Sequence, residues 1–166
     1  MSAPFRLRQP LHLLAVGFGL GLVPRAPGTF GTLAALPLLV LLLPAGWFVY
    51  LVATLLASLV GVWICQRAAE DAGVHDHPAI VWDEIAGFLV AAFPLSLGVG
   101  WIHPWVDLAT LFALFRFFDA VKPGPIRWLD RNLHGGLGIM ADDLAAGLAT
   151  ALLWWASLAL FAAPAV

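Results

Sequence analysis

The feature that most constrains this chain is a run of 19 residues without a single charge, from Trp47 to Cys65. As a helix, such a run rises about 28 Å, close to the thickness of about 30 Å of a bilayer's hydrocarbon core. Four further runs are mostly apolar, at 30–43, 79–95, 105–118 and 144–163. The sequence therefore predicts an all-α, multihelical integral membrane protein with about five apolar helices.

The overall composition agrees with a membrane protein. Hydrophobic residues make up 62% of the chain and charged residues 11%, and the mean hydropathy is +0.95. Soluble domains have about 45–50% apolar and about 25% charged residues. The apolar runs leave no room for a separate soluble domain, so we expect a single membrane-embedded domain over residues 1–166. A lone cysteine, Cys65, excludes an intrachain disulfide.

The distribution of basic residues predicts a topology. If the five runs alternate across the bilayer, all eight Lys and Arg residues fall on one face. The turns on the opposite face, Pro44 to Gly46 and Gly98 to Pro104, contain none. Because loops rich in Lys and Arg stay in the cytoplasm, we expect the amino end inside and the carboxyl end outside.

Two acidic pairs adjoin apolar runs. Asp83 and Glu84 begin the third run, and Asp142 and Asp143 open the last one, where a helix N-terminus would present them side by side. Stabilisation by the helix dipole, about 0.3–1 kcal/mol per residue, is one explanation. We favour a functional cluster, because ionisable groups at membrane depth are costly and usually serve function.

A third charged group lies between these pairs in the chain. Arg116, Asp119 and Lys122 are spaced i, i+3, i+6, so they share one side of a helix that Pro123 ends. The predicted topology places this triad and both acidic pairs at one cytoplasmic membrane boundary. Carboxylates suit Mg²⁺, and Arg and Lys suit phosphate. The candidate catalytic and metal-binding residues are Asp83, Glu84, Asp119, Asp142 and Asp143, and the candidate phosphate-binding bases are Arg116 and Lys122.

Two weaker patterns leave alternatives open. In the segment 27–32, PGTFGT, the backbone of Gly28 and Thr29 would precede a helix and could cradle phosphate, with Arg25 nearby. Thr29 as a simple N-cap is an equal alternative. His75 and His77 flank an aspartate and could hold zinc, but no firm third ligand is evident, so a solvated loop is the favoured interpretation.

Three blocks of this sequence resemble the phosphatidylglycerophosphatase A family. They are PGTFGT at 27–32, IVWDEIAG at 80–87, and FRFFDAVKPGPIRWLD with GGLGIMADDLAAG within 115–147. The resemblance covers roughly residues 15–150. It implies a multihelical, Mg²⁺-dependent phosphatase of the bacterial inner membrane that converts phosphatidylglycerophosphate to phosphatidylglycerol and inorganic phosphate. Gly124 departs from the family pattern, in which an aromatic residue is expected.

Carried onto matching positions, the resemblance implies that both acidic pairs help to hold the metal and that the Arg116 triad contacts phosphate or metal. The expected partners are an anionic phospholipid substrate and the bilayer, without nucleic acid, and the active site is expected to face the cytoplasm. We expect water as the nucleophile, with an aspartyl-phosphate on Asp119 as the alternative.

Other classes of protein make different demands on the same residues. A small ion-coupled transporter would place its carboxylates at mid-depth of the membrane, whereas here they lie at span ends. A non-catalytic subunit would use its charges only to pair with a partner. A phosphotransferase acting on nucleotide-activated lipid would need a nucleotide-binding motif, and we find none in the sequence.

Overall fold

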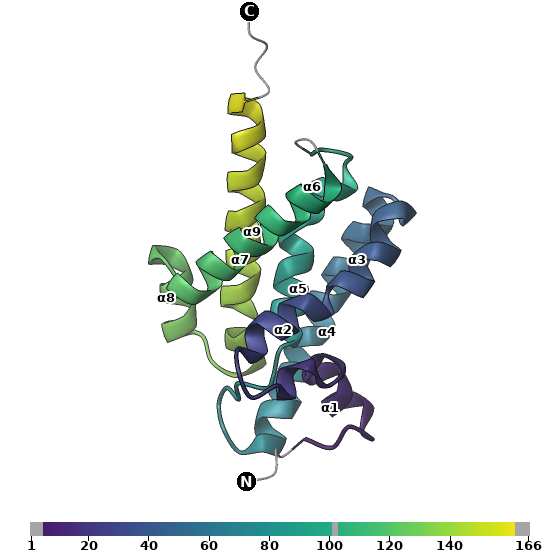
Figure 1. The fold of residues 1–166 in the computed structure, drawn as a ribbon. Helices are drawn as coiled ribbons and strands as arrows, with labels where there is room; N and C mark the ends of the chain where they lie inside the picture. Colours follow the sequence, from purple (N-terminus) through teal and green to yellow (C-terminus); the bar gives the residue numbers. More distant parts are fainter. Residues whose placement is uncertain (1–4, 101–102, 162–166) are drawn as a thin grey trace, which may run out of the picture.

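The computed structural model describes residues 5–100 and 103–161, and the regular structure of this part is entirely helical (Figure 1). The all-α prediction is therefore confirmed. The predictions for residues 1–4, for 101–102 in the turn at 98–104 and for 162–166 lie outside the described residues. The helices are α1 (Pro10–Ala15), η1 (Gly17–Leu22), α2 (Pro27–Ala34), α3 (Leu36–Leu42), η2 (Leu43–Ala45), α4 (Trp47–Ala72), α5 (Trp82–Ala91), α6 (Phe93–Ser96), α7 (Pro104–Val121), α8 (Gly124–Asn132) and α9 (Gly135–Phe161).

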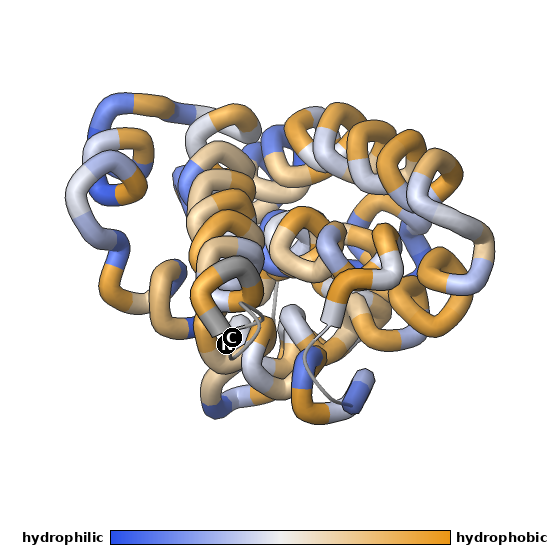
Figure 2. Tube along the Cα trace, turned by 90° about the horizontal axis from the view of Figure 1, so that it is seen from above, coloured by the Kyte–Doolittle hydropathy of each residue, from blue (hydrophilic) through white to orange (hydrophobic). Residues whose placement is uncertain are grey.

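Three stretches are long and apolar enough to cross a membrane: Pro27–Ala45, Trp47–Ala72 and Gly135–Leu158. The first two contain the predicted runs at 30–43 and 47–65, and the third covers the predicted run at 144–163 as far as Leu158. Large apolar side chains such as Leu59 and Trp63 are exposed along α4, which suits a helix that faces lipid. Seen from above, the helices are mainly hydrophobic and the hydrophilic segments are confined to limited patches (Figure 2).

The other two predicted runs form shorter or more polar helices. Helix α5 has only 10 residues and rises about 15 Å, so it cannot cross a bilayer alone. Pro94 follows it, at the beginning of the single-turn helix α6. Helix α7 has 18 residues but carries three charged side chains, those of Asp107, Arg116 and Asp119. The predicted helix stop is confirmed, since α7 ends at Val121, two residues before Pro123.

Two helix boundaries differ from the sequence prediction. Helix α4 continues to Ala72, seven residues beyond the charge-free run that ends at Cys65. Helix α9 begins at Gly135, seven residues before Asp142, so the prediction that the second acidic pair opens this helix is wrong. The glycine-rich segment is helical because it packs closely on α4. The backbone N–H of Gly136 donates to Gln66 at 2.6 Å, and a side chain at Gly136 would strike the carbonyl of Val62.

Helices α5 and α9 carry the two acidic pairs and cross at their backbones. A Cβ atom at Gly87 of α5 would overlap the carbonyl of Asp143, and one at Gly147 of α9 would overlap the carbonyl of Gly87. Small residues of this kind let membrane helices approach closely. Next to the crossing, Phe88 and Phe115 are fully buried with ring centroids 5.7 Å apart. This close crossing brings the acidic pairs to one end of the bundle.

Candidate active site

A polar cavity of about 360 Å³ lies where α5, α7, α8 and α9 meet the loop that precedes α5. The structure brings all five predicted metal-binding carboxylates to its wall, together with Lys122. The lining residues are His75, Asp76, Pro78, Ile80, Asp83, Glu84, Asp119, Lys122, Asp130, Leu133, Gly138, Ile139, Asp142 and Asp143. A cavity with six aspartates, one glutamate and one lysine in its wall is suited to cations and phosphate.

Another cavity of about 420 Å³ lies between α3, α6 and the start of α7. Its wall is mostly aliphatic, and the one charged residue there is Asp107. Because neither Lys nor Arg lines this second cavity, it cannot bind phosphate by charge pairing. We therefore place the chemistry in the polar cavity.

The first acidic pair sits in the first turn of α5. Asp83 is 9% exposed, and its Oδ1 accepts a hydrogen bond from the backbone N–H of Glu84 at 3.0 Å. Just before it, the indole Nε1 of Trp82 donates to the carbonyl of Ala57 on α4 at 3.0 Å. The start of α5 is thereby tied to a candidate membrane-spanning helix. Both acids are fixed by buried surroundings rather than by a mobile loop.

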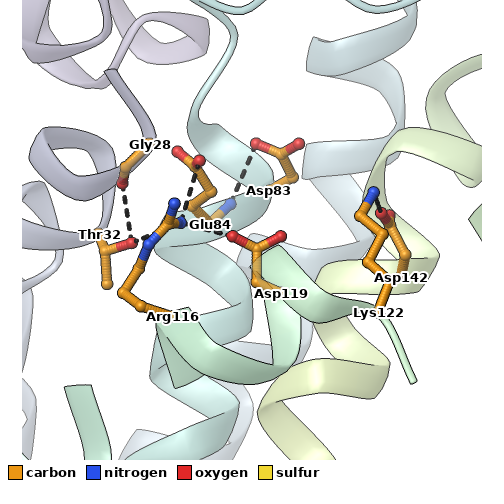
Figure 3. A network of polar contacts seen from close by, with 8 residues as sticks. All are labelled: Gly28, Thr32, Asp83, Glu84, Arg116, Asp119, Lys122 and Asp142. Carbon is orange, nitrogen blue, oxygen red and sulfur yellow. Dashed lines mark hydrogen bonds and ion pairs between the residues drawn. The ribbon is translucent and has the colours of Figure 1, made fainter. Parts of the chain in front are cut away.

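Arg116 is not among the lining residues of the cavity, but it connects α7 with α5 and α2 behind two acids that are (Figure 3). Its Nη1 forms an ion pair with Asp119 Oδ2 at 2.6 Å and donates hydrogen bonds to Glu84 Oε1 at 3.3 Å and to Thr32 Oγ1 at 3.4 Å. The Thr32 hydroxyl in turn donates to the carbonyl of Gly28 at 2.9 Å. Sequence reasoning missed the role of Thr32. The signal for it was its place one helical turn after Gly28.

The glycines of the PGTFGT block have a packing role. A Cβ atom at Gly28 would overlap Glu84 and Arg116, and one at Gly31 would overlap Glu84 and Val81. A side chain at Gly28 would displace the ends of the Glu84 and Arg116 side chains, and one at Gly31 would also meet Val81 close to its backbone, so both glycines favour the close approach of α2 to the Glu84–Arg116 pair. The other residues predicted to bind substrate here, Arg25 and Thr29, do not line the polar cavity, and their substrate-binding role stays a prediction.

Lys122 lies on the opposite side of the cavity. It ends α7 with a left-handed backbone, φ 47°, which turns its side chain away from the helix axis of Arg116 and Asp119. Its Nζ donates to Asp142 Oδ2 and to Asp130 Oδ1, each at 2.5 Å. Burial alone would lower the pKa of Lys122, but the two carboxylates outweigh burial and hold this pKa above its ordinary value. Lys122 therefore remains a cation at any physiological pH.

Some of the buried carboxylate oxygens lack a partner. Asp142 and Asp143 are 6% and 3% exposed, although they lie in the third turn of α9. Asp143 Oδ2 and Glu84 Oε2 are buried and accept no hydrogen bond from the described residues. The charge of Asp83 also repels that of Asp143. The helix dipole cannot account for Asp142 and Asp143, because its effect fades beyond the first turn.

The cavity also contains acidic residues that sequence reasoning did not select. Asp130, on α8, holds Lys122, and Asp76 lies in the loop before α5. Asp76 is exposed as a residue, yet protein atoms crowd its carboxyl group, and this desolvation raises its pKa above the ordinary value against the opposing charge of Lys122. The signal for Asp130 was its place in the same charged block, eight residues after Lys122.

The two histidines of the predicted zinc alternative have separate partners. His75 Nε2 accepts from the backbone N–H of Gly135 at 3.2 Å, whereas His77 Nδ1 accepts from that of Ala79 at 3.1 Å. Within residues 5–100 and 103–161, no three His, Cys, Asp or Glu side chains converge closely enough to form a ready-made metal site. The two histidines therefore have local structural roles.

Comparisons with known proteins find similar sequences over most of the chain. A sequence profile of the family described as Phosphatidylglycerophosphatase A matches residues 13–158. A phosphatidylglycerophosphatase A of Escherichia coli K12 is 46% identical over 146 residues, which are 88% of this chain and 82% of the relative. One from Haemophilus influenzae Rd is 50% identical over 144 residues, 86% of this chain and 85% of the relative.

A third relative, from Bacteroides thetaiotaomicron, carries the provisional name phosphatidylinositol-3-phosphatase and is 36% identical over 141 residues, 82% of this chain and 86% of the relative. No solved structure matches the chain. The family profile covers both acidic pairs and the Arg116–Lys122 segment. The first two relatives are identical to this chain at about half of the aligned residues. The chain therefore belongs to the phosphatidylglycerophosphatase A family.

Proposed function

We propose that this protein hydrolyses the terminal phosphate monoester of phosphatidylglycerophosphate in the polar cavity, with Mg²⁺ as cofactor and water as nucleophile. The reaction is the one for which the family and its two more similar relatives are named. The observation that carries the proposal is the meeting of five buried or half-buried carboxylates with Arg116 and Lys122 at one end of the helix bundle.

The residues around the cavity fit Mg²⁺. This ion prefers oxygen ligands, keeps several waters and usually takes one or two carboxylates besides substrate phosphate, so it needs no prearranged cage. Asp83 and Asp143 would hold it, because both are buried at the cavity and an oxygen of Asp143 has no partner. Asp142 would be a further ligand through the oxygen that Lys122 now holds, and Glu84 and Asp119, which pair with Arg116, would complete the acidic surroundings. When bound, Mg²⁺ neutralises phosphate charge and activates water.

The two bases would bind and orient the substrate's phosphate. Arg116 offers a planar fork that is already fixed by Glu84 and Asp119, and Lys122 offers a point charge at the other side of the cavity. Binding a phosphate between them would hold the scissile P–O bond towards the carboxylates. The acyl chains would remain along the apolar helices.

The site would face the cytoplasm of a bacterial inner membrane. Four basic residues lie at the cavity end of the bundle, and basic segments stay inside: Arg67 near the end of α4, Lys122 at the end of α7, and Arg127 and Arg131 on α8. The phosphate of a phospholipid in the inner leaflet lies at the same boundary.

The substrate assignment is tested by comparing two lipid phosphomonoesters. Purified protein with Mg²⁺ is expected to release inorganic phosphate from phosphatidylglycerophosphate at least about tenfold faster than from phosphatidylinositol 3-phosphate. A site that binds polar groups of its substrate discriminates strongly against a lipid whose headgroup differs, and about tenfold is the lower end of the ratios that small substrate differences give. A faster reaction with the inositol lipid would overturn the headgroup assignment. No release from either lipid, together with ion flux in liposomes, would favour the transporter alternative.

The nucleophile is tested separately by rapid acid quench with ³²P-labelled lipid. We expect no phosphate on the protein, because Asp119 is engaged by Arg116 and water is the proposed nucleophile. A labelled protein that disappears with Asp119→Asn would contradict the proposal and establish an aspartyl-phosphate.

A further inference from the structure

The Lys122 ammonium is shared between two carboxylates of unequal exposure. Its hydrogen bonds to Asp130 and to Asp142 have the same length, 2.5 Å. The side chain of Asp142 is 8% exposed, that of Lys122 28% and that of Asp130 41%. Lys122 therefore bridges a buried acid of the cavity wall and an acid at the cavity mouth.

The backbone around Lys122 fixes this arrangement. Lys122 leaves α7 in a left-handed conformation, and Pro123 and α8 then fold back beside α9, where Ile126 is buried. Asp130, near the end of α8, thereby returns to Lys122 after eight residues. Asp130 is therefore held by α8, which packs on α9, the helix that carries Asp142.

The resting arrangement conflicts with metal binding at one atom. In the proposed function, Asp142 contributes to the acidic surroundings of a divalent cation, yet its Oδ2 already accepts a hydrogen bond from a lysine ammonium. A divalent cation on that oxygen and the lysine ammonium would repel each other at short range. Binding of the cation there therefore favours movement of Lys122 away from the oxygen, and Lys122 has to remain near the cavity if it is to meet the substrate's phosphate.

We propose that Asp130 is a positioning residue that retains Lys122 at the cavity mouth and so releases Asp142 for the metal. With Asp130 present, Lys122 can give up its hydrogen bond to Asp142 and keep the one to Asp130, which has the same length. Without it, Lys122 pairs with Asp142 alone and competes with the cation. This inference rests on the proposed function only for the identity of the incoming phosphate; the competition between Lys122 and a cation is a property of the three side chains.

The test measures binding of Mn²⁺, as a paramagnetic substitute for Mg²⁺, by electron paramagnetic resonance of the full-length protein in detergent micelles. We expect Asp130→Asn to weaken Mn²⁺ binding about tenfold, the lower end of the effect of residues that support metal ligands. The Mg²⁺ concentration for half-maximal phosphate release should rise by a similar factor. Asp130→Glu, which keeps the charge, should restore most of the affinity. Arg131→Gln, a charge change on the adjacent exposed residue of α8, should leave it within about twofold.

A double-mutant cycle separates positioning from a general charge effect. Lys122→Met alone should strengthen Mn²⁺ binding, because Asp142 loses its competing ammonium, although turnover falls. In the Lys122→Met background, Asp130→Asn should then change Mn²⁺ affinity by less than about twofold. An equal loss in both backgrounds, or no loss in either, would overturn the inference. If the wild type and the three variants bind Mn²⁺ with the expected affinities but the wild type releases no phosphate, the proposed function fails and the role of Asp130 stands.

Discussion

At the level of single residues, the site consists of carboxylates that the protein satisfies incompletely. A buried carboxylate without a partner costs free energy unless a cation compensates it. Asp143 is 3% exposed with one oxygen unpartnered, and Glu84 has an unpartnered oxygen although Arg116 holds the other. Such residues reduce stability in return for function. Replacing such a carboxylate is therefore expected to lower activity without lowering stability.

Asp143→Asn is the corresponding test. Phosphate release should fall at least about 100-fold, the scale on which a key electrostatic group contributes. In metal-free buffer the variant should unfold at the same temperature as wild type or a higher one, because a neutral amide replaces a buried acid. Thermal unfolding in detergent and phosphate release check the two parts. A variant that is both inactive and markedly less stable would assign Asp143 a structural role instead.

At the level of helices, the geometry depends on how closely α5 and α9 cross. The carbonyl groups of Gly87 and Asp143 occupy the space that a side chain at the crossing would need. Glycine in a helix interior costs about 0.5–1 kcal/mol relative to alanine. The glycines nevertheless allow α5 and α9 to approach closely enough to bring the two acidic pairs together, which a larger side chain at the crossing would prevent.

Gly147→Ala should therefore impair both folding and activity. The added methyl meets the carbonyl of Gly87, a backbone atom that can move only with its helix, so we expect a loss of about 1–3 kcal/mol of stability. Phosphate release per folded molecule should fall at least tenfold, because a displacement of about 1 Å suffices for larger losses. The matched control is Gly61→Ala on α4, whose new methyl meets the side chains of Met140 and Trp82 rather than backbone. Equal effects of the two substitutions on activity would contradict the importance of the crossing.

Helix starts were harder to predict from the sequence than the apolar runs themselves. The run at 47–65 was correctly placed in a helix, because only a helix satisfies its backbone in lipid. The helix start was predicted at Asp142 and Asp143, but α9 begins at Gly135. In the fold Gly135 and Gly136 allow α9 to pack on Gln66 and Val62, and such long-range packing leaves no local signal.

The candidate site was predictable in its residue types and less so in its pairing. Asp83, Glu84, Asp119, Asp142 and Asp143 stood out as acids beside apolar runs, and all line one cavity. The spacing of Arg116, Asp119 and Lys122 predicted one shared helix side. The left-handed conformation of Lys122 instead sends its side chain to α8 and α9, and a single backbone angle of this kind cannot be deduced from spacing.

At the level of the whole molecule, the orientation in the bilayer decides which leaflet supplies the substrate. The three span-capable stretches are separated by the tight turn at Gly46 and by the segment that carries α5 to α8. Three crossings would place Pro27 and Leu158 on opposite sides of the bilayer. The loop charges favour a cytoplasmic cavity.

Cysteine accessibility can test this orientation, because the native Cys65 is buried and should give a low background. In intact spheroplasts, a membrane-impermeant maleimide should label Ala45→Cys, in the exposed turn η2, and should not label Arg131→Cys on α8. After permeabilisation both variants should react. Labelling of Arg131→Cys in intact spheroplasts would place the cavity on the outer face and contradict the proposed topology.

The central claim, metal-dependent hydrolysis of a lipid phosphate at the polar cavity, is tested most directly by phosphate release from phosphatidylglycerophosphate. The purified protein should release phosphate with Mg²⁺, stop when EDTA removes the metal and resume when Mg²⁺ is restored. Asp83→Asn, folded as judged by its unfolding temperature, should be at least about 100-fold slower under the same conditions. Release that continues in EDTA, or an Asp83→Asn variant with the wild-type rate, would contradict the account.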